Sequence, residues 1–278
     1  MYLSIAIPAS LVSDVPHLRE KTSHLGMIGR ALAIFHVEEI LIYRDMPEKN
    51  QKFDIELIST ILSYMETPQY LRKYLFPKIP NLNYAGILPP LRTPHHPITK
   101  KIATLKDGEM REGVVVKTGT KTLVDIGVEH PIPLNEQSLS LWQRVTVIIH
   151  KENQKISMKR VKQQPHNQYW GYKINVSHLG LSQILRENIF DVVILTSRFG
   201  KSLTEAAEKL RSRLKGTNKM LIAFGSPKQG LKEILEREGL QIDNINFLVL
   251  NTIPQQGVET VRTEEAIYST LAIMNIIM

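Results

Sequence analysis

The 278-residue sequence contains no cysteine, and only 6% of its residues are aromatic. Without cysteine the chain has no disulfide bonds, thiolate metal sites or cysteine nucleophiles, which fits a reducing compartment. A long hydrophobic run is also missing at the N-terminus, where MYLSIAIPAS is too short to span a membrane and lacks the basic start of a signal peptide. We therefore expect a cytoplasmic protein with no membrane partner.

Several common catalytic patterns are absent as well. The sequence has no HExxH, P-loop or EF-hand pattern. A nucleotide-dependent enzyme of Rossmann type would need a GxGxxG after the first strand, and the stretch from Ile5 to Val12 has no glycine. The adjacent His95 and His96 lie in a Pro-rich loop without further ligands nearby, so we expect no metal.

Three segments in the C-terminal part share one design, an apolar strand followed by an unusual loop and an amphipathic helix. They are Phe190 to Leu214, Lys219 to Gly239 and Phe247 to Asn275. In the first, Ser202 and Glu205 fit a capping box at the start of the helix. Three such units in succession predict a parallel sheet, and ligands of such sheets collect beyond the carboxyl ends of the strands. We expect the three loops to converge.

The N-terminal part supplies further elements of the same α/β domain. Strands are predicted at Tyr2–Pro8 and Glu38–Arg44, with a helix between them within Asp14–His36. Apolar residues recur at helical spacing in Phe53–Met65 and in Pro68–Phe76. A last strand, Tyr169–Val176, is expected to join the sheet, with Trp170 and Tyr172 packed in the core rather than stacked on bases.

A stretch of different texture interrupts this domain. It opens with the Pro-rich segment Leu88–Pro97, which marks a domain boundary. Residues 92–165 hold 13 basic and 7 acidic residues, which is most of the net charge of +8. Short β-like runs at Glu112–Lys117, Lys121–Val128, Arg144–His150 and Lys155–Val161 predict a small all-β barrel of about five strands. The basic residues suggest RNA binding, and a solvated, purely structural surface is the alternative.

The two loops FGSPKQG and NTIPQQGVETVRTEEA resemble the C-terminal motifs of the SPOUT class of RNA methyltransferases. The N-terminal Ser23–Asp45 and the position of the insertion are similar to the archaeal and eukaryotic SPOUT subfamily with an OB-like insertion, so the resemblance covers nearly the whole chain. It implies a SPOUT-type parallel sheet with a C-terminal trefoil knot in residues 1–91 and 166–278, and an OB-like RNA-binding insertion in residues 92–165.

The resemblance also implies a cofactor and the residues that bind it. S-adenosylmethionine would be held in the knotted cleft, and no metal or covalent nucleophile is needed for methyl transfer. The implied binding residues are Thr196, Ser197, Arg198, Gly200, Phe224, Gly225, Ser226, Pro227, Leu250, Asn251, Thr252, Ile253, Gln255, Gly257, Thr260 and Val261. We expect Gly257 to permit close backbone approach.

For the acceptor, the resemblance points to Arg30, in an otherwise apolar helical stretch, with Arg262 and Glu264 as second candidates. Arg30 would orient a phosphate or stabilise a base that loses its proton, and the alternative is a surface arginine with no role in the reaction. The expected activity is methylation of structured RNA, at family level N3 of a uridine in large-subunit rRNA, by a homodimer. A non-catalytic RNA-binding or ribosome-assembly protein that keeps the fold remains the alternative.

Overall fold

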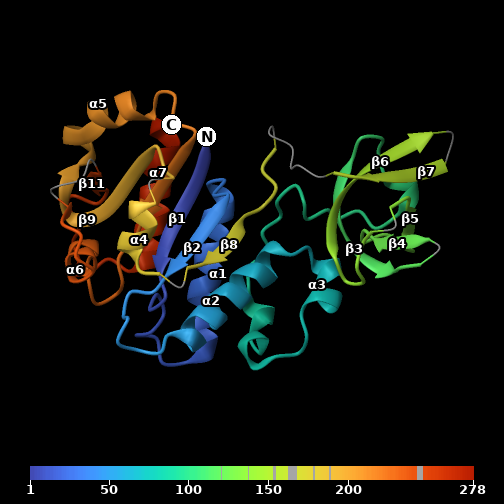
Figure 1. Ribbon diagram of the computed structural model, residues 1–278, viewed down its shortest axis with the longest axis horizontal. Helices are drawn as coiled ribbons and strands as arrows, with labels where there is room; N and C mark the ends of the chain where they lie inside the picture. The colour runs from blue at the N-terminus through green and yellow to red at the C-terminus, as the bar shows by residue number, and fades with distance from the viewer. Residues whose placement is uncertain are drawn as a thin grey trace. The chain divides into compact units, whose positions relative to one another are not determined.

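The computed structural model describes residues 1–119, 121–136, 138–152, 155–161, 168–177, 179–187, 189–242 and 247–278 (Figure 1). The chain divides into two compact units. The first comprises Met1–Ser63, Asn81–Pro89 and Tyr172–Met278, and the second comprises Tyr64–Pro80 and Pro90–Gly171. Each unit has its own sheet. The predicted insertion boundary at Pro165 lies outside the described residues.

The first unit is built on a six-stranded sheet of order β11-β9-β10-β1-β2-β8. All neighbouring strands pair in parallel. In chain order the strands are β1 (Tyr2–Pro8), β2 (Glu39–Tyr43), β8 (Lys173–Val176), β9 (Val192–Ser202), β10 (Lys219–Ala223) and β11 (Leu248–Asn251). These pairings confirm the predicted parallel sheet. The strands are continuous apolar runs because a parallel sheet is covered on both faces.

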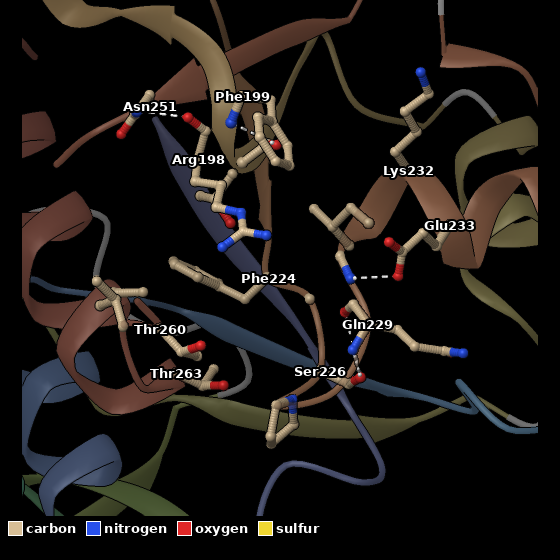
Figure 2. A pocket seen from close by; sticks show the side chains of 18 of the residues that line it. Arg198, Phe199, Phe224, Ser226, Gln229, Lys232, Glu233, Asn251, Thr260 and Thr263 are labelled. Atoms are coloured by element: carbon tan, nitrogen blue, oxygen red, sulfur yellow. Dashed lines mark hydrogen bonds between the residues drawn. The ribbon is translucent and has the colours of Figure 1, made fainter. Parts of the chain in front are cut away.

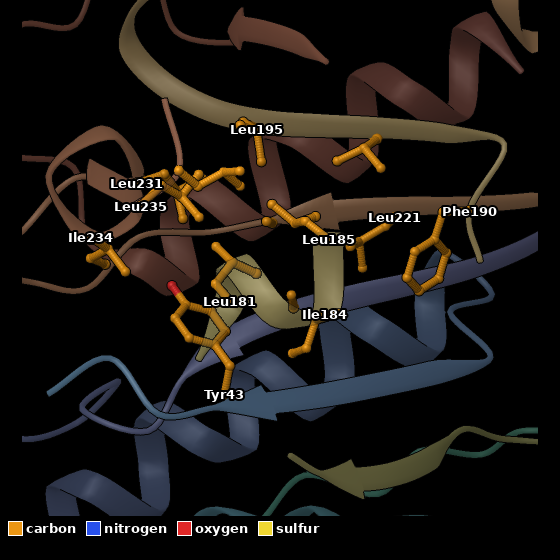
Figure 3. Close-up of a cluster of buried hydrophobic side chains, with 14 residues drawn as sticks. Tyr43, Leu181, Ile184, Leu185, Phe190, Leu195, Leu221, Leu231, Ile234 and Leu235 are labelled. Atoms are coloured by element: carbon orange, nitrogen blue, oxygen red, sulfur yellow. The ribbon is translucent and has the colours of Figure 1, made fainter. Parts of the chain in front are cut away.

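Helices of the first unit cover both faces of this sheet. They are α1 (Leu18–Ile34), α2 (Lys52–Glu66, whose last three residues belong to the second unit), α4 (Leu181–Arg186), α5 (Leu203–Leu214), α6 (Leu231–Arg237) and α7 (Thr263–Ile277). Figure 3 shows α4 and α6 contributing Leu181, Leu185 and Leu235 to a core with Leu195 and Leu221 of the sheet. Alternate strand residues such as Ile5, Ile194 and Ile222 are also fully buried, so the opposite face is covered too.

One strand prediction needs correction. Of the stretch Tyr169–Val176, only Lys173–Val176 forms a strand, β8, which pairs with β2. Gly171 has a φ of +88°, which an extended strand cannot include, and a Cβ there would lie 2.6 Å from the Glu66 carboxylate. The backbone therefore turns at Gly171. Trp170 and Tyr172 are each only 4% exposed, which confirms that they pack in the interior.

The second unit contains an antiparallel sheet of order β5-β4-β3-β6-β7. Its strands are β3 (Met110–Lys117), β4 (Thr122–Asp125), β5 (Ile132–Leu134), β6 (Arg144–Glu152) and β7 (Lys155–Arg160), and α3 (Gln69–Leu75) belongs to the same unit. The edge strands β5 and β7 contact each other, so the sheet nearly closes into a barrel. The strands enclose an apolar core that includes Val115, Val124, Val147 and Ile149. The expected small barrel is thereby observed.

Short 3-10 turns η1 (Pro80–Leu82), η2 (Ala85–Ile87) and η3 (Ile102–Thr104) connect these elements. Within the second unit, the end of α2 is joined to the barrel by a buried ionic network. The Arg144 guanidinium donates to both oxygens of Glu66, at 2.6 and 2.9 Å, and to Glu112 at 2.6 Å. Trp170 Nε1 donates to the other oxygen of Glu112 at 2.6 Å.

This network shifts the titration of Glu66. Burial by itself raises the pKa of Glu66, but the charge of Arg144 and hydrogen bonds from His95 and Arg144 outweigh it and lower that pKa from 4.5 to about 2. His95 is fully buried and its Nε2 also lies 2.9 Å from the Glu66 carbonyl oxygen. The histidine pair of the Pro-rich loop thus packs against the end of α2.

Candidate functional site

A pocket of about 530 Å³ opens in the first unit at the carboxyl ends of β10 and β11 and beside residues 196–199 of β9 (Figure 2). All three loops predicted to converge line it. This is the position at which parallel α/β sheets bind ligands, because the strand ends leave a crevice between successive loops.

The loop within β9 arises from a break in strand pairing. Val249 of β11 pairs with Leu195, but the next residue, Leu250, pairs with Lys201. Residues 196–200 therefore leave the ladder, and Thr196 to Phe199 line the pocket. The Thr196 hydroxyl donates to the carbonyl oxygen of Ala223 at 2.9 Å, which ties this loop to the end of β10.

Gly200 is required by the return of this loop to the sheet. A Cβ at Gly200 would lie 2.7 Å from the Leu250 carbonyl carbon and 2.9 Å from the Asn251 nitrogen. These are backbone atoms of β11, which cannot move aside without disturbing the sheet. Asn251 Nδ2 in turn donates to the carbonyl oxygen of Arg198 at 2.7 Å, so the two loops are held together.

The loop after β10 is a tight turn. Ser226 and Gln229 hydrogen-bond in both directions: Gln229 N–H donates to Ser226 Oγ at 3.0 Å and Ser226 N–H donates to the Gln229 carbonyl oxygen at 2.9 Å. Phe224, 1% exposed, begins this loop, and Tyr43 donates its hydroxyl to the Phe224 carbonyl oxygen at 2.7 Å. The turn brings the start of α6 onto the pocket, with Lys228, Lys232 and Glu233 along its wall.

The loop between β11 and α7 completes the pocket. Asn251 Oδ1 accepts a hydrogen bond from Ile253 N–H at 3.0 Å, and the hydroxyls of Thr252 and Thr270 lie 2.9 Å apart. Arg198 donates to the carbonyl oxygen of Glu259 at 3.2 Å and so crosses from the first loop to the third. The first turn of α7 reaches the pocket with Thr263 and Ala266.

The structure brings most of the residues expected to bind the cofactor into this one pocket. They are Thr196, Ser197, Arg198, Phe224, Gly225, Ser226, Pro227, Leu250, Asn251, Thr252, Ile253, Thr260 and Val261. Gly200, Gln255 and Gly257 are not among its lining residues. A Cβ at Gly257 would meet no atom within 4 Å, so packing within the described part of the chain does not require glycine there.

Sequence reasoning missed several lining residues, chiefly Phe199, Gln256, Glu259 and the segment from Lys228 to Glu233. The apolar periodicity of α6 predicts its buried face, but the polar residues Lys232 and Glu233 of its first turn line the pocket. Phe199 is 84% exposed, and its neighbour Arg198 lies over its ring at 4.7 Å. An aromatic residue inside a loop gave no periodic signal.

The three residues expected to act on the acceptor do not line the pocket: Arg30 lies on α1, Glu264 lies on α7 and Arg262 directly precedes α7. Arg30 is partly buried on α1. Burial of Tyr268 raises the pKa of its hydroxyl, and the positive charge of Arg30 opposes that rise. Glu264 is 7% exposed and lies 2.9 Å from Nδ1 of His24. Arg262 is exposed at the start of α7, where its N–H donates to Glu265 at 2.9 Å. Their roles stay predictions.

A parallel sheet whose loops build a pocket at the strand ends is the architecture of α/β proteins that bind ligands there, and this chain adds a separate barrel unit. Comparison with known proteins gives the family. A family model described as "Putative RNA methyltransferase" matches residues 2–274. The chain belongs to this RNA methyltransferase family, whose activity requires a methyl donor.

Several known proteins align with almost the full length of this chain. An uncharacterized protein of Halobacterium salinarum is 33% identical, with 98% of each chain covered. The mouse 28S rRNA (uridine-N(3))-methyltransferase is 32% identical over 97% of this chain and 75% of its own length. The human protein of the same name is 30% identical over 97% of this chain and 77% of its own.

Two further features concern the described residues alone. None of their helices has the length and apolar character needed to cross a membrane. Among the same residues, no group of three or more His, Asp or Glu side chains is placed to hold a metal ion.

Proposed function

We propose that this protein transfers a methyl group from S-adenosylmethionine to N3 of a uridine in large-subunit rRNA. The observation that carries the proposal is the single pocket formed by the three strand-end loops, in a chain whose mouse and human relatives are named as 28S rRNA (uridine-N(3))-methyltransferases. Both relatives align with 97% of this chain, so the similarity includes the pocket and the barrel unit.

The pocket residues fit S-adenosylmethionine in size and charge. The volume of about 530 Å³ lies in the range of small-molecule sites. Its lining combines apolar Phe224, Leu250 and Ile253 with charges of both signs, Arg198, Lys228, Lys232, Glu233, Glu236 and Glu259. A molecule with an aromatic base, a carboxylate and two cationic groups matches such a mixed lining. The first turn of α7, with Thr263, also offers backbone amides to a carboxylate.

When bound, S-adenosylmethionine supplies an electrophilic methyl group on its sulfonium. The chain's task is to hold the acceptor nitrogen in line with that methyl group, with S-adenosylhomocysteine as the leaving group, and to favour loss of the N3 proton of uridine to water. We assign the second task to Arg30, whose cation would stabilise the uridine anion as it forms. Arg262, exposed at the start of α7, and Glu264, paired with His24, are second candidates.

We further propose a homodimer in which Arg30 acts at the partner's pocket. Arg30 shares one face of α1 with Met27 and Ile34, which are 46% and 48% exposed although apolar. Tyr268 of α7 donates to the Met27 carbonyl oxygen at 3.1 Å, so both helices contribute to this surface. Exposed apolar residues around a functional arginine fit an interface between copies.

The fold proposal is a SPOUT domain with a C-terminal trefoil knot, and the barrel is proposed to be an OB-like RNA-binding module. The five-stranded order of the barrel and its excess of basic residues support the second part.

Nucleoside mapping of host rRNA, with and without the gene, tests the function. We expect one N3-methyluridine in large-subunit rRNA to disappear when the gene is deleted and to return with the wild-type gene. If every methyl mark persists, the catalytic function is wrong. A protein that then binds RNA but gives no heat on titration with S-adenosylmethionine would be a non-catalytic RNA-binding protein.

A further inference from the structure

Trp142 of the barrel unit occupies a backbone conformation that tryptophan rarely adopts. It lies in the turn from Ser140 to Gln143, which is closed by a hydrogen bond from Gln143 N–H to the Ser140 carbonyl oxygen at 3.1 Å. Its φ is +65°. At the third position of a turn, a positive φ favours glycine or asparagine, and a bulky residue there is strained. Strain of this kind collects at functional sites.

Burial does not compensate for this strain. Trp142 is 46% exposed, whereas the other tryptophan, Trp170, is 4% exposed. One face of the Trp142 indole stacks on Tyr74 of α3, with ring centroids 5.3 Å apart and an interplanar angle of 22°. Among the described residues, Tyr74 is the aromatic residue that stacks on Trp142. The stack therefore presents a partly exposed indole.

The stack is held in place from both sides. Trp142 N–H donates to the Val115 carbonyl oxygen of β3 at 2.8 Å. The Tyr74 hydroxyl donates to the Asp125 carboxylate of β4 at 2.8 Å, which fixes the orientation of the Tyr74 ring. An aromatic surface fixed in this way binds a planar group with little loss of side-chain freedom.

Two exposed lysines lie on the elements that hold the stack. Lys73 has a 65% exposed side chain, and its Nζ lies 4.5 Å from the centre of the Tyr74 ring and 3.8 Å from Asp125, whose charge it offsets. The exposed Lys117 follows two residues beyond Val115 on β3. Cations around a stacked aromatic surface complement a base with its attached phosphate.

We propose that Trp142, stacked on Tyr74, is a platform for an unpaired base of the RNA on which the enzyme acts. The proposal rests on the RNA-directed function above and assigns the barrel a specific contact. Paired bases in a helix cannot reach the indole face, so the ligand is single-stranded RNA or a loop.

The test uses the full-length protein and a short single-stranded oligouridylate. Because the chain has two tryptophans and Trp170 is buried, quenching of the intrinsic fluorescence reports mainly on Trp142. We expect quenching on titration with the oligonucleotide. Trp142→Gly suits the positive φ and should fold at least as stably, yet its affinity should fall about tenfold or more. Because this variant lacks the reporting indole, the affinities of all variants are measured by the fluorescence anisotropy of a dye-labelled oligouridylate. Trp142→Phe should retain most of the affinity while losing the quenching.

Leu141→Ala is the matched control, since Leu141 precedes Trp142 in the same turn and is 48% exposed. Its affinity should equal that of the wild type. Unchanged affinity of Trp142→Gly, or a wild type that does not bind the oligonucleotide, would overturn the platform. Methyl transfer to rRNA is scored separately with labelled S-adenosylmethionine. A protein that binds the oligonucleotide through Trp142 but transfers no methyl group would contradict the enzymatic function alone.

Discussion

At the scale of single residues, the proposed mechanism separates two tasks. Side chains and backbone of the three loops form the pocket, whereas Arg30 lies on α1 outside its lining. A cation that stabilises the negative charge left on the base when the N3 proton departs does not need to touch the cofactor. Loss of Arg30 should therefore affect turnover without affecting cofactor binding.

We predict that Arg30→Ala lowers kcat by about a hundredfold or more, because one preorganised charge facing a developing anion contributes on that order. The affinity for S-adenosylmethionine, measured by calorimetric titration, should stay unchanged. Arg19→Ala is the control, since Arg19 is an exposed arginine on the same helix. If the kcat of Arg30→Ala equals that of the wild type, Arg30 has no role in the reaction.

The buried Glu66 gives a prediction for pH. Its pKa in the folded state is about 2, below the ordinary 4.5. A lowered pKa means that the stabilisation is complete above about pH 4.5 and is lost as the pH falls towards 2. Glu66→Gln should lower the free energy of unfolding by about 3 kcal/mol at pH 7, because Arg144 loses one of its two carboxylate partners in the interior.

Urea denaturation at several pH values measures this effect. The difference between wild type and Glu66→Gln should shrink below about pH 4, where the wild type loses its own stabilisation. Glu56→Gln, on the first-unit part of the same helix and without an ion pair among the described contacts, is the control. A difference independent of pH would show that the charge of Glu66 is not what stabilises the unit.

At the scale of elements, the bulge of residues 196–200 shapes the pocket, and Gly200 brings the end of that bulge back against the β11 backbone. We predict that Gly200→Ala destabilises the protein by about 2 kcal/mol and abolishes cofactor binding, because its Cβ would collide with the β11 backbone. Thermal unfolding and calorimetric titration measure the two effects.

Gly257→Ala is the matched substitution in the third loop. It should leave the unfolding temperature unchanged, since no atom lies within 4 Å of the added Cβ. Weaker binding of S-adenosylmethionine to Gly257→Ala would show that the cofactor passes close to this backbone, as the resemblance implies. If Gly200→Ala unfolds and binds like the wild type, the close approach of β9 and β11 does not shape the site.

Elements with a clear apolar period could be predicted from the sequence. The helix within Asp14–His36 is α1, and the capping box of Ser202 and Glu205 is present at the start of α5. Features that depend on tertiary contact could not. The short strand β5, the turn at Gly171 and the grouping of Tyr64–Pro80 with the barrel follow from contacts distant in sequence.

The site was predictable to the extent that loops after parallel strands share one edge of the sheet. Thr196, Ser226 and Thr252 lie together for that reason. Phe199 and Lys232 could not be anticipated, because their place depends on a bulge in β9 and on the tight turn before α6. The platform at Trp142 depends on a stack with Tyr74, which is 68 positions away in the sequence and shows no periodic relation to it.

At the scale of the whole molecule, the proposed dimer makes Arg30 act at a neighbouring pocket. Replacing Met27 and Ile34 together by aspartate should convert a dimer to a monomer, because both side chains are exposed and apolar on the face that carries Arg30. Sedimentation velocity measures the change. The monomer should bind S-adenosylmethionine and transfer no methyl group.

Ile98→Asp is the control, since Ile98 is apolar and 80% exposed in the other unit. It should remain dimeric and active. A wild-type protein that is monomeric at micromolar concentration and still active would rule out catalysis across an interface.

Methyl transfer itself is tested most directly by incubating the purified protein with isotope-labelled S-adenosylmethionine and large-subunit rRNA from cells that lack the gene. Mass analysis of the digested nucleosides then identifies the labelled product. We predict labelled N3-methyluridine from the wild type and at least a hundredfold less from Arg30→Ala. The proposed reaction would be contradicted if no nucleoside carried the label, or if the label appeared in a nucleoside other than N3-methyluridine.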